Sequence, residues 1–171
     1  MAEERPMHGL MNHFSQPGTL EWIGLRTGPR KPVESVSETY VRIGTGLDGD
    51  RYKGQPESKR QVTLISREHL DAVASFVGRE QVDPADVRRN LVIRGVNLQA
   101  LKGKQFKIGE VVLEYTGECH PCSRMEEVLG VGGYNAMRGH GGITAKVLQE
   151  GNIQVGDSLE VLDEVQASEK E

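Results

Sequence analysis

Short strand-like segments, divided by glycine-centred turns, are the feature that most constrains the fold of this chain. The 171 residues include 21 glycines, and sustained 3.6-residue periodicity is scarce. Short alternating or β-branched segments recur instead, which is typical of strands. These segments are Leu20–Arg26, Val33–Val36, Thr39–Ile43, Gln61–Ile65, Leu91–Arg94, Gln105–Ile108, Val111–Tyr115, Ala145–Leu148 and Ser158–Leu162. We therefore predict a mainly β protein, built as a closed or partly open β-barrel.

A few short helices are expected between these strands. One amphipathic segment begins after Ser66, which can cap a helix, and ends at Gly78, which supplies a left-handed stop. A second helix can start at Asp83, with Pro84 at its first position, where a missing N–H costs nothing. A third is expected over Ser123–Leu129. We expect the first of these helices to pack on the barrel.

The size of the chain fits one domain that buries its own core. We expect this domain over residues 18–163, between a flexible N-terminal segment at 1–17 and a flexible acidic tail at 164–171. A net charge of -4 with 27% charged residues is ordinary for a soluble globular protein and does not call for nucleic acid. No apolar run approaches a membrane span, and the acidic start lacks the core of a secretory signal. The expected location is the cytoplasm, without a membrane partner.

The only two cysteines, Cys119 and Cys122, lie within Gly117–Ser123 and are followed at once by Arg124. A thiolate is both a nucleophile and a soft metal ligand, and a neighbouring cation favours it. In a reducing compartment such a pair is more typical of catalysis or metal binding than of a disulfide, and two cysteines are too few for a Cys-only zinc site. The pair also follows a strand and precedes a helix, as redox dithiols do, although the chain lacks the βαβ units of a thioredoxin-like fold.

Arginines before a strand suggest an anion pocket. Arg88 and Arg89 precede Asn90 and the apolar segment Leu91–Arg94. A guanidinium can hold a phosphate or a carboxylate through two parallel hydrogen bonds. The alternative is a solvated turn, because most exposed charges have no specific role.

Two glycine-rich loops add candidate groups. The loop Gly44–Arg51, which includes Asp48, is neither a dinucleotide fingerprint nor a P-loop, and its alternative is a structural turn. In Gly132–Thr144, backbone amides can approach an anion while Arg138 completes the charge; the alternative is a long hairpin connection. His140 is a candidate ligand or base, although a lone loop histidine is usually solvated.

Together these motifs resemble the MOSC family, the domain found at the C-terminus of molybdenum cofactor sulfurases and as small stand-alone bacterial proteins. The resemblance rests on their order along most of the chain: Glu21–Gly24, Gly46–Arg51, Gln61–Ile65, Arg88–Ile93, Pro121–Met125 and Arg138–Ile143. It implies a barrel-like fold with one family cysteine. That cysteine falls on Cys122, because the family pattern places it after a proline and two residues before a basic residue. Cys119 is then an additional thiol.

The resemblance implies one of two activities. Some members resemble sulfur carriers that work with a pyridoxal-phosphate cysteine desulfurase, and others bind the molybdenum cofactor, a molybdopterin, and reduce N-hydroxylated compounds. The chain shows neither a desulfurase nor an iron–sulfur domain, so we expect a separate electron donor or cysteine desulfurase, a small-molecule substrate, and no pyridoxal phosphate on this chain. The oligomeric state stays open.

The expected site follows from the resemblance and from the chemistry of these groups. Cys122 would ligate molybdenum or carry a persulfide, Arg124 would favour its thiolate, and Cys119 would be a resolving thiol, a substitute sulfur site or a bystander. The expected cofactor-binding residues are Arg88, Asn90, Arg138, Gly139, Gly142, Asp48 and Arg51. Two alternatives remain: a cofactor-free dithiol or persulfide redox protein that uses both cysteines, and a non-enzymatic anion-binding module in which the thiols are incidental.

Overall fold

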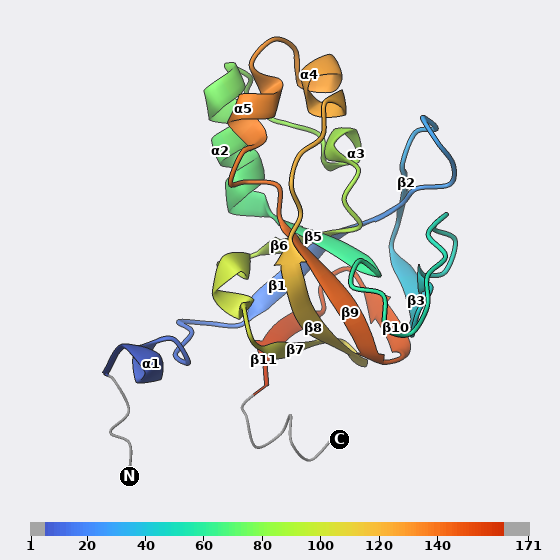
Figure 1. The fold of residues 1–171 in the computed structure, drawn as a ribbon, viewed down its shortest axis with the longest axis vertical. Coiled ribbons are helices and arrows are strands. Elements are labelled where there is room, and N and C mark those ends of the chain that lie inside the picture. Colours follow the sequence, from blue (N-terminus) through green and yellow to red (C-terminus); the bar gives the residue numbers. More distant parts are fainter. Residues whose placement is uncertain (1–5, 163–171) are drawn as a thin grey trace.

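A closed barrel of strands forms the body of the computed structural model, which describes residues 6–162 (Figure 1). Around the barrel the strands are β11 (Ser158–Val161), β7 (Gln105–Ile108), β8 (Val111–Glu118), β9 (Ile143–Gln149), β5 (Val62–Ser66), β6 (Leu91–Arg94) and β1 (Gly18–Leu25). The pairing of Gly18 with Leu159 and of Thr19 with Ser158 closes it. The strands β5 and β6 run parallel and the other neighbours antiparallel, so the barrel is mixed. The predicted fold is thereby confirmed, whereas the acidic tail expected at 164–171 lies outside the described residues.

Two smaller features complete the β-structure. The strand β2 (Glu34–Val36) pairs with β1, and β10 (Gly151–Gln154), β3 (Glu38–Arg42) and β4 (Gly46–Leu47) form a separate sheet. Each segment predicted as a strand contains one, with ends displaced by at most three residues. The strands β4 and β10 escape prediction because β4 spans two residues and both contain glycine, a weak strand former.

Short helices gather above one end of the barrel (Figure 1). They are α2 (Arg67–Val77), α3 (Pro84–Val87), α4 (Arg124–Leu129) and α5 (Gly133–Met137), while α1 (Pro6–Leu10) and the 3₁₀ turn η1 (Leu98–Leu101) lie lower. As predicted, the Ser66 hydroxyl accepts from the amide of His69, Gly78 ends α2 at a φ of 73°, and Asp83 caps α3. In contrast, α5 lies in the stretch treated above as a loop. Across residues 6–162, no helix has both the length and the apolar character that a membrane crossing needs.

The apolar residues form two cores on opposite sides of β5 and β6. Inside the barrel, Leu20, Leu64 and Phe106 are fully buried. Outside it, Ile65 and Val92 pack with residues of the helices, namely Leu70, Val73, Val87, Met125, Leu129 and Met137. Strands that are buried on both faces read as continuous apolar runs, which explains the sequences of β5 and β6. The segment between β8 and α4, which carries both cysteines, connects the barrel to the helical layer.

Candidate functional site

The two cysteines occupy different environments. Cys119 is 1% exposed, whereas Cys122 is exposed just before α4, and both are free thiols. The amide of Cys119 donates to the carbonyl of Gly142 at 2.8 Å. A Cβ on Gly141 would lie 2.1 Å from the carbonyl oxygen of Cys119, so only glycine allows this close approach. The fold therefore fixes Cys119 and presents Cys122 to solvent.

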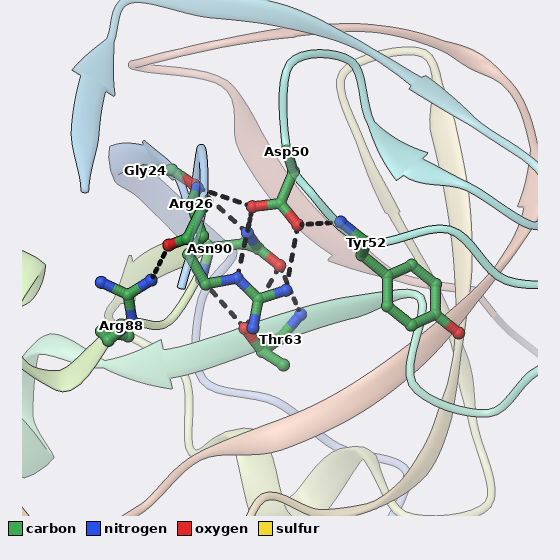
Figure 2. Close-up of polar contacts among 8 residues, drawn as sticks. Gly24, Arg26, Asp50, Tyr52, Thr63, Arg88 and Asn90 are labelled. Atoms are coloured by element: carbon green, nitrogen blue, oxygen red, sulfur yellow. Dashed lines mark hydrogen bonds and ion pairs between the residues drawn. The ribbon is translucent and has the colours of Figure 1, made fainter. Parts of the chain in front are cut away.

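Asp50 is the centre of a network of polar contacts that includes Arg26, Tyr52 and Asn90 (Figure 2). Its buried carboxylate accepts from the backbone amide of Arg26 at 2.7 Å, from Nε at 3.2 Å and from Nη2 at 3.0 Å. It also accepts from the amide of Tyr52 and from Nδ2 of Asn90, each at 3.2 Å. Burial raises the pKa of Asp50, but the hydrogen bonds and charge of Arg26 outweigh it, so that the pKa lies below its usual value. Asp50 is therefore held as a carboxylate that fixes Arg26.

Asn90, just before β6, joins β1 and β5 to the loop that carries Asp50. Its Oδ1 accepts from the amide and the hydroxyl of Thr63, each at 3.2 Å. Its Nδ2 donates to the carbonyl of Gly24 and to Asp50, each at 3.2 Å. These four bonds use the full capacity of the amide group, and the side chain is 1% exposed. Asn90 therefore positions Asp50 and the start of β6.

Arg88 lies in an unusual backbone conformation. Its φ of 55° is in the left-handed region, which costs a non-glycine residue about 1–2 kcal/mol. Its guanidinium donates to the carbonyls of Lys31 at 2.6 Å and Gly28 at 3.1 Å. The strained residue is thus held in place by the β1–β2 connection, with its half-buried guanidinium at the rim of the site (Figure 2).

Arg89 points into the protein. It is 6% exposed, and it donates through Nε to the carbonyl of Gly141 and through Nη1 to that of Val87, each at 2.8 Å. Its Nη2 is buried and, within residues 6–162, has no hydrogen-bond partner; the same holds for Nε of Arg124. Because Gly141 adjoins Cys119, Arg89 connects the start of β6 to the thiol segment. A buried guanidinium with a free donor is the part of the site most suited to an anion.

Six arginines make up what we call the arginine cluster. Its members are Arg26, Arg51, Arg60, Arg88, Arg89 and Arg124. Burial lowers the pKa of Arg88, and the positive charges of Arg124, Arg26 and Arg51 lower it further. Burial likewise lowers the pKa of Arg89, with contributions from Arg60 and Arg26 that Cys119 and Cys122 oppose. These six guanidinium groups therefore place positive charge next to the thiols.

The remaining predicted residues divide between this site and other places. Arg51 joins the cluster, because its amide donates to the carbonyl of Arg26 at 2.7 Å. Gly142 lies against β5, where a Cβ would be 2.0 Å from the carbonyl oxygen of Leu64. Asp48 instead forms an exposed ion pair with Arg42 at 2.8 Å, beside the small sheet.

Arg138 and Gly139 lie at the exposed end of α5. The carbonyl of Gly139 accepts from Gln99 at 3.0 Å, and the carbonyl of Arg138 lies 2.9 Å from Nδ1 of His140. The His140 ring packs edge-on against His69, with centroids 4.8 Å apart. Gly139 thus contacts η1, and His140 contacts α2.

Among the described residues, potential metal ligands do not gather as a set. Within residues 6–162, no three His, Cys, Asp or Glu side chains are placed to share a metal ion. A metal at this site would therefore be held mainly by a bound organic group, with Cys122 as the exposed soft ligand.

A cavity lies away from this site, beside β7 and β11. It is lined by Asn12, by residues 14–17, by Lys104 and by residues of β7, β8 and β11, among them Glu114 and Glu160. It contains neither thiol nor any member of the arginine cluster.

The sequence marks neither Arg26 nor Arg60, and it places Asp50 only among the aspartates of the glycine-rich loop Gly44–Arg51. The sequence marks Arg89 only as the second of two adjacent arginines before a strand. The role of Asp50 depends on partners 24 and 40 residues away, so no local pattern marks it.

A mixed barrel with an exposed thiol beside an arginine cluster defines the class of protein. The chain matches the MOSC domain over residues 27–160 and belongs to the MOSC domain family. No curated protein sequence matches it.

Solved structures show the same fold. The YuaD protein from Bacillus subtilis is 20% identical, with a TM-score of 0.75 over 85% of this chain and 96% of that one. YiiM from Escherichia coli is 21% identical, with a TM-score of 0.66 over 86% of this chain and 70% of that one. YiiM from Geobacillus stearothermophilus is 17% identical, with a TM-score of 0.70 over 86% and 76%. At these identities the likeness is one of fold.

Proposed function

We propose that this MOSC protein binds the molybdenum cofactor through Cys122 and reduces N-hydroxylated compounds with electrons from a separate protein. The observation that carries the proposal is an exposed thiol beside a cluster of arginines. A molybdopterin presents a phosphate at one end and a dithiolene-bound metal at the other, so it needs cationic donors and a soft ligand. The arginines of this site suit the phosphate end, and Cys122 suits the metal end.

Particular residues would hold each end of the cofactor. Arg88 and Arg51, half-buried and exposed respectively, would bind the phosphate. The unused donors of Arg89 and Arg124 support the presence of an anion, because a buried N–H without an acceptor is costly. Cys122 would ligate the metal, which supplies the two-electron chemistry when it is bound.

The other polar residues would keep this arrangement rigid. Asp50 and Asn90 fix Arg26 and the start of β6, so the cationic groups are oriented before a ligand arrives. Arg89 and the glycines at 141 and 142 fix Cys119, and thereby the segment that presents Cys122. These residues position and do not react.

Sulfur transfer is the second candidate, favoured by the exposure of Cys122. A desulfurase partner must reach the accepting sulfur, and Cys122 meets that need. The Cys122 thiolate would attack the terminal sulfur of the donor's persulfide, leaving a persulfide on Cys122 and a thiolate on the donor. A dithiol cycle is less well supported, because Cys119 is 1% exposed and both thiols must be reachable.

Cofactor content tests the proposal directly. Protein purified from a host that makes the cofactor is expected to contain molybdenum by mass spectrometry and, after oxidation, a fluorescent pterin. Cys122→Ser should lose both, whereas Cys119→Ser, the matched control, should keep both. Molybdenum-free wild-type protein, or a Cys122→Ser protein that keeps its molybdenum, would contradict the proposal. A persulfide on Cys122 in metal-free protein would favour sulfur transfer.

A further inference from the structure

The arginine cluster carries more positive charge than a single cofactor needs. Among the described residues, its only ion pair joins Arg26 to Asp50. A terminal phosphate carries about two negative charges, and the Cys122 thiolate adds one. Positive charge therefore remains beside the thiol, in a chain whose net charge is -4.

This charge is graded from the interior to the surface. Arg89 is buried, Arg26, Arg88 and Arg124 are half-buried, and Arg51 and Arg60 are exposed. Cations arranged in this way focus the potential and draw an anion from solvent toward the deeper groups. This gradient of charge suits a small anionic molecule that can reach the deeper arginines.

Hydrogen bonds hold the loop that carries Arg60, one of the two exposed members of the arginine cluster. Gln61 is 1% exposed, and its Nε2 donates to the carbonyls of Gln55 at 3.3 Å, Pro56 at 3.0 Å and Ser58 at 2.8 Å. The hydroxyl of Thr116, on β8, donates to the carbonyl of Lys59. Arg60 is therefore anchored beside the strand that leads to Cys119.

We propose, on the basis of the function above, that the substrates are N-hydroxylated compounds that also carry a carboxylate or phosphate, and that Arg60 determines this specificity. The reaction takes two electrons from the donor and two protons, breaks the N–O bond, and yields the reduced nitrogen compound and water. The anionic group remains unchanged and serves only for binding and orientation.

Matched substrate pairs test the proposal, with chemically reduced methyl viologen as the electron donor. One pair is N4-hydroxycytidine and its 5′-monophosphate, and the other is benzamidoxime and 4-carboxybenzamidoxime. The anionic member is expected to have a kcat/KM about tenfold higher, within the range that steering produces. The advantage should shrink when ionic strength rises from about 0.01 M to about 0.15 M, because screening shortens from about 30 Å to about 8 Å. A preference in the phosphate pair alone would narrow the class to nucleotides.

The variant Arg60→Gln should lower this preference about threefold or more while molybdenum content stays unchanged. Lys107→Gln, on the exposed face of β7, makes the same charge change away from the site and should leave the preference unchanged. Calorimetry on the molybdenum-loaded protein without an electron donor, which tests binding without turnover, should show tighter binding of each anionic compound than of its neutral partner. Equal kcat/KM values within both pairs, or a preference that Arg60→Gln leaves intact, would overturn the inference. Failure to reduce any of the four compounds would instead count against the proposed function.

Discussion

At the scale of single residues, the site depends on one buried carboxylate. Asp50→Asn would remove the charge that pairs with Arg26, whose side chain is 15% exposed, while keeping the shape of residue 50. We expect a loss of about 3 kcal/mol in the free energy of unfolding, because a partly buried cation is left without its partner. Asp48→Asn, which breaks the exposed pair with Arg42, should cost less than about 1 kcal/mol. Urea denaturation measures both losses in the free energy of unfolding. Equal losses would show that the Asp50–Arg26 pair stabilises the fold no more than an exposed ion pair does.

The contact between His69 on α2 and His140 in the loop before β9 predicts that stability depends on pH. Burial lowers the pKa of His69, and the charge of His140 lowers it further, against a smaller opposite effect of Glu68. Below about pH 6.5 the unfolded chain then binds more protons at this residue than the folded chain, so stability falls as the pH falls. His69→Gln should therefore lose less stability than the wild type between about pH 7 and about pH 5. Denaturation at several pH values checks this, and parallel losses would disprove it.

At the scale of elements, the sequence predicts those helices and strands whose ends and buried faces are determined by local residue chemistry. The segment after Ser66 has a cap, an apolar stripe and a terminal glycine, and α2 follows it closely. The helix α5 could not be found in this way, because Gly132 and Gly133 lie at its start. A side chain on Gly133 would be 2.6 Å from Leu129, so tight packing on α4 is what requires glycine there. Tertiary contact, rather than helix propensity, explains that element.

The glycine loop before β9 offers a matched test of close packing. Gly139 and Gly142 both have left-handed φ values, 79° and 89°. A Cβ at 139 meets nothing within 4 Å, whereas at 142 it would lie 2.0 Å from the carbonyl oxygen of Leu64. Gly139→Ala should cost only the backbone strain, about 1–2 kcal/mol, and Gly142→Ala clearly more. Thermal unfolding distinguishes them, and a Gly142→Ala protein as stable as Gly139→Ala would refute the packing argument.

At the scale of the whole molecule, the site depends on barrel closure more than on any motif. Arg26 follows β1, Asp50 follows β4, and Asn90 precedes β6. The contacts of Asp50 with Arg26 and Asn90 span 24 and 40 residues of sequence. The order of the motifs along the sequence indicates the family fold and a site that combines arginines with a thiol. It could not distinguish Asp48 from Asp50, because only the barrel decides which carboxylate faces Arg26.

The two cores predict two levels of stability. The helices α4 and α5 span six and five residues and depend on packing against the outer face of β5 and β6, so they can open locally while the barrel stays closed. Leu129→Ala, in the outer core, should accelerate amide hydrogen exchange in α4 and α5 and leave β8 and β9 protected. Phe106→Ala, inside the barrel, should cost about 3–5 kcal/mol and lower protection throughout. Because Cys119 is 1% exposed in the segment that joins the two layers, opening of the outer layer should also increase its rate of alkylation. Uniform loss of protection in Leu129→Ala would mean that both cores unfold as one unit.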